Sequence, residues 1–124
     1  MDKLRMLIVE DNALFRKTLR ESLETSFPNA VIDEAVNGVE ALLKVQALAP
    51  DLIFMDIRLP GKSGLELTPI IKENYPEIII LILTNYDIPE CRRVALRYGA
   101  DHFISKDSLN RIRLEELVRS YYKI

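Results

Sequence analysis

Residues 52–61 read Leu-Ile-Phe-Met-Asp-Ile-Arg-Leu-Pro-Gly, and this stretch indicates the fold more strongly than any other part of the chain. Four consecutive apolar residues are typical of a strand that is covered on both faces of a parallel sheet. Asp56 ends this strand, and a Pro-Gly turn follows at once. In open α/β sheets ligands bind at the carboxyl ends of the strands. Asp56 is therefore the first candidate site residue.

Three further apolar runs also end in polar residues. Glu10 and Asp11 follow Leu-Ile-Val, Thr84 follows Ile-Leu-Ile-Leu, and Lys106 follows Phe-Ile-Ser. Because the carboxyl ends of parallel strands meet at one edge, we expect these side chains to gather there with Asp56. Carboxylates that leave room for phosphate oxygens suit a magnesium ion. The set therefore predicts a site for Mg²⁺ and a phosphoryl group.

Strand and helix patterns alternate five times along the chain. Repeated βα units predict an α/β fold in one domain, a parallel sheet with right-handed crossovers and helices on both faces. We expect strands at residues 4–9, 31–35, 51–55, 78–83 and 102–104. Helix starts are indicated by a capping residue with Glu three positions later, at Asn37, Ser63 and Asp87.

The sequence predicts the inward faces of two helices and an irregularity in a third. In the fourth helix an apolar stripe with i, i+3, i+4, i+7 spacing should face the sheet: Cys91, Val94, Ala95 and Tyr98. The last helix repeats this spacing at Leu114, Leu117, Val118 and Tyr121. Pro69 lies inside the third helix, which should be kinked, late-starting or short because proline removes a backbone donor.

Composition narrows the class of protein. The chain has 124 residues, of which 48% are hydrophobic and 29% charged, as in a soluble globular domain. A net charge of −2 gives no indication that the protein binds nucleic acid or an anionic membrane. The single cysteine, Cys91, allows no internal disulfide, and no secretory leader or bilayer-spanning run is evident. We expect a cytoplasmic protein.

The candidate residues allow more than one role when each is taken alone. Glu10 and Asp11 could hold a cation or merely cap the next helix. Asp56 could coordinate the same metal, or attack phosphorus and form an aspartyl phosphate. Lys106 could pair with Asp56 and later with a phosphoryl oxygen. The coincidence of four strand ends favours the chemical roles over the structural ones.

These stretches, together with Gly64 and Gly99-Ala100-Asp101, resemble the receiver domain of two-component response regulators over essentially the whole chain. The resemblance implies a (βα)5 flavodoxin-like fold with strand order 2-1-3-4-5. It implies that Asp56 accepts a phosphoryl group from a sensor histidine kinase. Glu10 and Asp11 would organise Mg²⁺, with the backbone carbonyl of Arg58 as a further ligand.

The resemblance also implies a switching mechanism. Lys106 would bind the phosphoryl group, Thr84 would move toward it, and Phe103 stands where the family has its aromatic switch residue. A core role for Phe103 remains an alternative. The changed surface of the fourth helix, fifth strand and fifth helix would then form a homodimer or contact an output. The implied role is regulatory, without direct binding of nucleic acid or membrane by this domain.

Departures from the family pattern raise further hypotheses. Many receivers have proline after the lysine, whereas here Asp107 follows Lys106. This Lys-Asp pair resembles the receivers that feed helix-turn-helix outputs, and hence transcription. Arg58 and Tyr86 are bulky for positions beside the phosphoryl group, and we expect them to slow its hydrolysis by excluding water.

A phosphohydrolase or phosphotransferase acting on small molecules is the alternative class, but Arg58 stands where such enzymes place an acid/base Asp. We expect residues 1–124 to be a receiver without an output domain.

Overall fold

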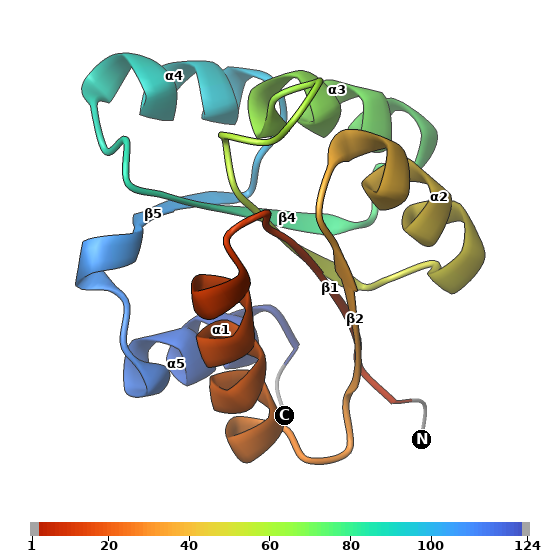
Figure 1. Ribbon diagram of the computed structural model, residues 1–124, viewed down its shortest axis with the longest axis vertical. Coiled ribbons are helices and arrows are strands. Elements are labelled where there is room, and N and C mark those ends of the chain that lie inside the picture. Colours follow the sequence, from red (N-terminus) through yellow and green to blue (C-terminus); the bar gives the residue numbers. More distant parts are fainter. Residues whose placement is uncertain (1–2, 123–124) are drawn as a thin grey trace.

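The computed structural model describes residues 3–122 as a five-stranded parallel sheet between two layers of helices (Figure 1). The strands are β1 (Arg5–Val9), β2 (Val31–Ala35), β3 (Leu52–Met55), β4 (Ile79–Thr84) and β5 (His102–Ser105). The helices are α1 (Ala13–Ser26), α2 (Gly38–Leu48), α3 (Gly64–Asn74), α4 (Pro89–Arg97) and α5 (Arg111–Tyr122), with a 3-10 turn, η1 (Lys106–Ser108). The strand order β2-β1-β3-β4-β5 confirms the predicted topology.

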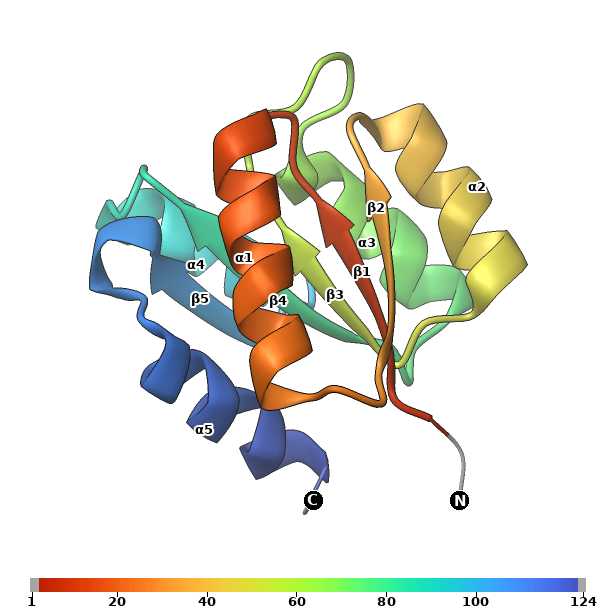
Figure 2. The same ribbon diagram turned by 60° about the horizontal axis from the view of Figure 1, so that its bottom comes forward.

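Alternate residues of each strand pack on opposite faces of the sheet. Leu7 and Val9 of β1 contribute to the core under α2, α3 and α4, whereas Met6 and Ile8 contribute to the core under α1 and α5. The other inner strands repeat this alternation, so both faces are apolar and both are covered. Figure 2 shows α1 and α5 together on one side of the sheet.

Side-chain caps fix the starts of α2 and α3 as predicted. Asn37 accepts the N–H of Glu40 (2.8 Å), and Ser63 with Glu66 forms a full capping box. The predicted cap at Asp87 is wrong. Proline at the first position of α4 holds the preceding residue, Ile88, in an extended conformation, so Ile88 is the N-cap. Asp87 instead pairs with Arg92.

Two expectations about the helices need correction. Tyr98 remains 43% exposed, because α4 ends at Arg97 and Tyr98 is its C-cap rather than part of the inward stripe. Pro69 neither delays nor shortens α3, which begins at Gly64 and continues to Asn74. The capping box fixes the first turn of α3, and its apolar face is buried on both sides of Pro69. None of the helices within residues 3–122 has the length and apolar character that crossing a bilayer requires.

Candidate functional site

Glu10 lies at the carboxyl end of β1 and is almost fully buried. Its N–H donates to the carbonyl of Ala35 (2.9 Å), which continues the β1–β2 ladder by one residue. Its carboxylate accepts hydrogen bonds from the Asn12 N–H (3.0 Å) and from Lys106 Nζ (2.5 Å). Burial raises the pKa of Glu10 and the Asp56 charge adds to this rise, while the two hydrogen bonds oppose it.

Asp56 occupies the equivalent place at the end of β3, next to β1. Its N–H donates to the carbonyl of Val9 (3.0 Å), so the sheet holds its backbone. One carboxylate oxygen accepts the N–H of Ile57 (2.8 Å), and the other lies 3.3 Å from Lys106 Nζ. The side chain is 9% exposed, so the carboxylate is largely buried but still reaches solvent.

Gly64 approaches the backbone of Asp56 more closely than any side-chain-bearing residue could. The N–H of Gly64 donates to the carbonyl of Ile57 (2.9 Å), which brings the start of α3 against the end of β3. A Cβ on Gly64 would lie 2.0 Å from the carbonyl oxygen of Asp56. Glycine is therefore required here by proximity, and not by an unusual φ angle.

Lys106 provides the cation of the site from the end of β5. Its ammonium bridges Glu10 and Asp56, and it also lies 4.3 Å from the ring centroid of Phe15 in the first turns of α1. Sequence reasoning did not identify Phe15. Its position four residues after Asp11 was the only signal, because a cation–π contact between distant segments leaves no local pattern.

The three carboxylates are arranged so that they could hold a cation. One oxygen from each of Glu10, Asp11 and Asp56 lies within 4.8 Å of the other two. Asp11 is exposed and, with Arg58, lines an open pocket between the β1 and β3 ends. Carboxylate oxygens around an accessible position are the donors that Mg²⁺ prefers, since it keeps several waters. The residues present fit a magnesium ion.

Thr84 lies at the end of β4 and is fully buried. Its hydroxyl accepts the N–H of Tyr86 (3.0 Å), two residues later in the β4–α4 loop. In the β4–β5 register Thr84 is opposite Ser105, the residue before Lys106. The structure thus brings Thr84 to the predicted edge, while its hydroxyl bonds to its own loop.

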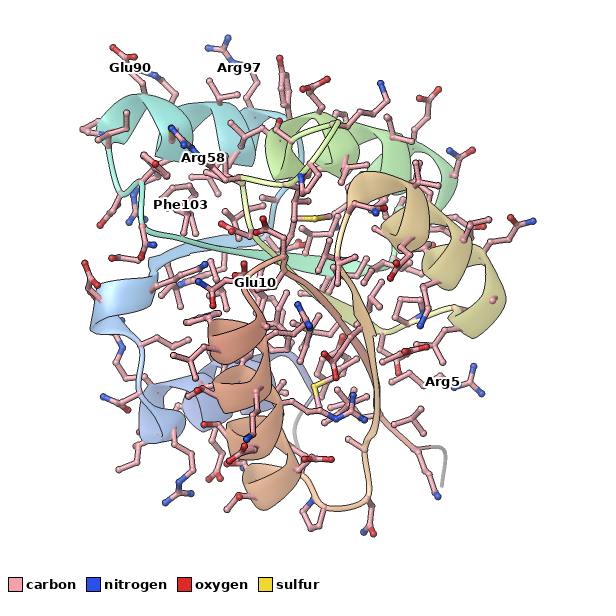
Figure 3. All side chains as sticks on the ribbon, viewed as in Figure 1. Arg5, Glu10, Arg58, Glu90, Arg97 and Phe103 are labelled. Carbon is pink, nitrogen blue, oxygen red and sulfur yellow. The ribbon has the colours of Figure 1, made fainter. Side chains whose placement is uncertain are left out.

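Phe103 is buried in the core beneath α4, on the face of the sheet opposite Lys106. The guanidinium of Arg92, from α4, lies 5.0 Å from the centre of its ring. Figure 3 shows Phe103 and Arg58 on the side of the sheet that carries α4, and Glu10 beside the start of α1. Phe103 therefore connects β5 with α4 rather than with the carboxylates.

Arg58 and Tyr86 stack on each other across two loops. The Arg58 guanidinium lies 4.5 Å from the ring centroid of Tyr86. Arg58 comes from the β3–α3 loop and Tyr86 from the β4–α4 loop, each two residues after a candidate site residue. The pair joins the loop that follows β3 to the loop that follows β4.

Known proteins match both the sequence and the structure. Residues 6–119 match the response regulator receiver domain family. The chain is 37% identical over 121 residues to the oxygen regulatory protein NreC of Staphylococcus carnosus, covering 97% of this chain and 55% of NreC. It is 39% identical over 102 residues to the chemotaxis protein CheY of Halobacterium salinarum, covering 82% and 83%.

The solved structure of the signal receiver domain of the putative response regulator NarL from Mycobacterium tuberculosis has a TM-score of 0.89 to this chain. The two share 29% identity, covering 99% of this chain and 98% of that one. Several curated relatives are much longer than this chain. It spans 55% of NreC and 29% of the protein-glutamate methylesterase/protein-glutamine glutaminase of Pyrococcus abyssi.

The family match covers every strand except the first residue of β1 and includes every strand end described above. The fold, with its five parallel strands in the order 2-1-3-4-5, agrees with this match. The chain therefore belongs to the response regulator receiver domain family, the phosphorylation-dependent signalling switches of two-component systems.

Proposed function

We propose that Asp56 is the phospho-acceptor of this receiver and that a sensor histidine kinase is its donor. The observation that carries the proposal is the ammonium of Lys106, which lies 3.3 Å from a carboxylate oxygen of Asp56 while both side chains are only 9% exposed. The neighbouring Glu10 pairs with the same ammonium at 2.5 Å. The site therefore combines a nucleophile with a cation that can follow the charge of an incoming phosphoryl group.

Charge balance supports a divalent metal beside Asp56. When ionised, Glu10, Asp11 and Asp56 carry three negative charges, and the site ammonium of Lys106 offsets one of them. Mg²⁺ would be held by these carboxylates together with the backbone carbonyl of Arg58. When bound, the ion offsets the repulsion between a carboxylate and a phosphoryl donor.

In the transfer step a carboxylate oxygen of Asp56 forms a bond to phosphorus while the P–N bond of the phosphohistidine breaks. The electron pair of the broken bond returns to the imidazole nitrogen, and the acyl phosphate remains on Asp56. Lys106 would then pair with a phosphoryl oxygen. The hydroxyl of Thr84 accepts one hydrogen bond and keeps its own hydrogen, which it could donate to another phosphoryl oxygen.

The output would follow from a change around β5. Movement of Thr84 and Lys106 would disturb Phe103 and the helix packed over it. Exposed Leu96 of α4 and Ile112 of α5 support a role for the surface of α4, β5 and α5 in a homodimer or in contact with an output domain or protein. We propose that this output controls transcription, by analogy with the regulatory relatives.

The stacked Arg58 and Tyr86 would shield the acyl phosphate from water and so set the lifetime of the signal. Arg58 cannot act as a general acid or base at neutral pH, which argues against turnover of small phosphorylated substrates. We place the protein in the cytoplasm, with residues 1–124 forming a single receiver domain.

Phosphorylation with a small donor tests the proposal directly. Acetyl phosphate and Mg²⁺ should add the mass of one phosphoryl group to the wild-type protein, and Asp56→Asn should remain unmodified. The matched control Asp51→Asn changes an exposed Asp at the opposite end of β3 and should be labelled normally. Equal labelling of wild type and Asp56→Asn would refute the assignment, and repeated turnover of sugar phosphates would favour an enzyme instead.

A further inference from the structure

The carbonyl group of Glu10, the first residue after β1, accepts its hydrogen bond from a side chain. The paired residues of β1 and β2 end at Val9 and Ala35, and the Glu10 N–H makes the final ladder bond. The carbonyl of Glu10 accepts a hydrogen bond from Arg16 Nη1, on α1, at 2.9 Å. A guanidinium from the following helix thus satisfies the carbonyl at the end of this strand.

This carbonyl has special importance because of the peptide plane to which it belongs. The C=O of Glu10 and the N–H of Asp11 lie in one rigid plane. The orientation of this plane, together with the flanking dihedral angles, influences where the side chains of Glu10 and Asp11 leave the backbone. A donor that holds the Glu10 carbonyl therefore restricts the backbone that joins two of the three candidate metal ligands.

Arg16 is itself held in place by Glu34 on the edge strand β2. Arg16 Nε lies 2.6 Å from one carboxylate oxygen of Glu34, and its side chain is 19% exposed. Because a planar guanidinium can donate in several fixed directions, Arg16 engages Glu34 and the Glu10 carbonyl together. Through these two contacts Arg16 links β2 and α1 to the residue that follows β1.

A neighbouring arginine provides an internal comparison. Arg20, one turn further along α1, lies 2.6 Å from the other carboxylate oxygen of Glu34. Its remaining contact with β2 is to the carbonyl of Ile32 (3.0 Å), far from the site end of the strand. Arg16 and Arg20 therefore share a partner, a helix and a charge, but only Arg16 reaches the Glu10 carbonyl.

We propose that Arg16 is a positioning residue for the metal site, acting through the peptide plane between Glu10 and Asp11. This inference rests on the proposed Mg²⁺-dependent function. Arg16 does not touch the metal position and its charge is already paired with Glu34. Its contribution is to hold the two acidic side chains ready for the ion, which lowers the cost of ordering them on binding.

The test compares Arg16→Met with Arg20→Met in the phosphodonor-free protein. Each change keeps an apolar stem and leaves Glu34 with one arginine partner. We expect Arg16→Met to weaken Mg²⁺ binding, measured by calorimetry, about tenfold, the lower end for loss of a group that supports metal ligands. Arg20→Met should keep the wild-type dissociation constant. In the metal-free state the Asp11 amide NMR signal should shift in Arg16→Met but not in Arg20→Met.

Thermal unfolding of both metal-free variants separates positioning from general stability, because both should lose similar stability. If Arg16→Met does not fold, Arg16→Lys replaces it, since lysine can reach one acceptor but lacks the fork that joins both. Unchanged binding in the Arg16 variant, or equal weakening in both arginine variants, would overturn this inference alone. Failure of the wild-type protein to bind Mg²⁺ would overturn the proposed function as well.

Discussion

Replacing Gly64 with alanine should destabilise the protein far more than the same change at Gly38. Both glycines are the first residue of a helix and follow a side-chain N-cap, so the helix context is matched. A Cβ on Gly64 would lie 2.0 Å from the carbonyl oxygen of Asp56 and 2.9 Å from Met55 Cγ. The nearest neighbours of a Cβ on Gly38 would be side-chain atoms, of Leu67 at 3.3 Å and of Lys62 at 3.6 Å.

The magnitude follows from the displacement that each change requires. Non-bonded atoms pack best at about 3.5–4.0 Å, so the obstacle at Gly64 must move by about 1.5 Å. That obstacle is the backbone, and we therefore expect a loss of about 3 kcal/mol, the upper end of ordinary overpacking costs. At Gly38 the Leu67 side chain would need to shift by only about 0.2 Å to reach ordinary packing distance, so stability should change by less than about 1 kcal/mol.

Urea denaturation followed by circular dichroism measures both changes. With a slope of about 1–3 kcal/mol per molar for a domain of this size, Gly64→Ala should lower the urea midpoint by about 1–3 M. The midpoint of Gly38→Ala should stay close to that of the wild type. Equal midpoints for the two variants would refute the argument that Asp56 and Gly64 are in essential backbone contact.

Three further predictions concern the charged groups of the site. Burial raises the pKa of Glu10 in the folded protein above its ordinary value of 4.5. Protonation of Glu10 therefore stabilises the fold. This stabilisation is complete below pH 4.5 and is lost as the pH rises through the raised pKa. The unfolding free energy of metal-free Glu10→Gln should therefore fall less than that of the wild type between pH 4.5 and neutrality; parallel urea-derived profiles would contradict this. Phe15→Leu and Lys106→Met should show a coupling of about 1 kcal/mol in a double-mutant cycle of urea unfolding, as expected for a cation–π contact, and additive effects would exclude that contact. The double variant Arg58→Ala plus Tyr86→Ala should shorten the phosphoryl lifetime, measured by mass spectrometry after donor removal, and an unchanged lifetime would rule out a shielding role.

Local sequence signals were sufficient for the sheet and for the gathering of the strand ends. Apolar runs that end in Glu10, Asp56 and Lys106 identify both the strands and the edge at which they meet, because strand direction and site position are linked in parallel sheets. The caps at Asn37 and Ser63 were predictable because a capping residue and the helix that it caps are neighbours in sequence.

Contacts that depend on how the elements pack, or on competition between local preferences, were not predictable. Phe15 and Arg16 look like ordinary positions of an amphipathic helix, and only the packing of α1 on the sheet brings them to Lys106 and to the Glu10 carbonyl. Asp87 failed as a cap because the conformational restriction that proline imposes on the preceding residue outweighed the capping preference of Asp. The reason for glycine at position 64 likewise becomes visible only from its distance to Asp56.

The alternation of side chains along β5 has a mechanical consequence. Lys106 projects toward α1, whereas Phe103, three residues earlier, lies on the opposite face beneath α4. Among the described strands β5 pairs only with β4, so a small slide of β5 strains a single ladder of hydrogen bonds. If β5 slides, Lys106 on one face of the sheet and Phe103 on the other would move together, because both belong to the same short segment of chain.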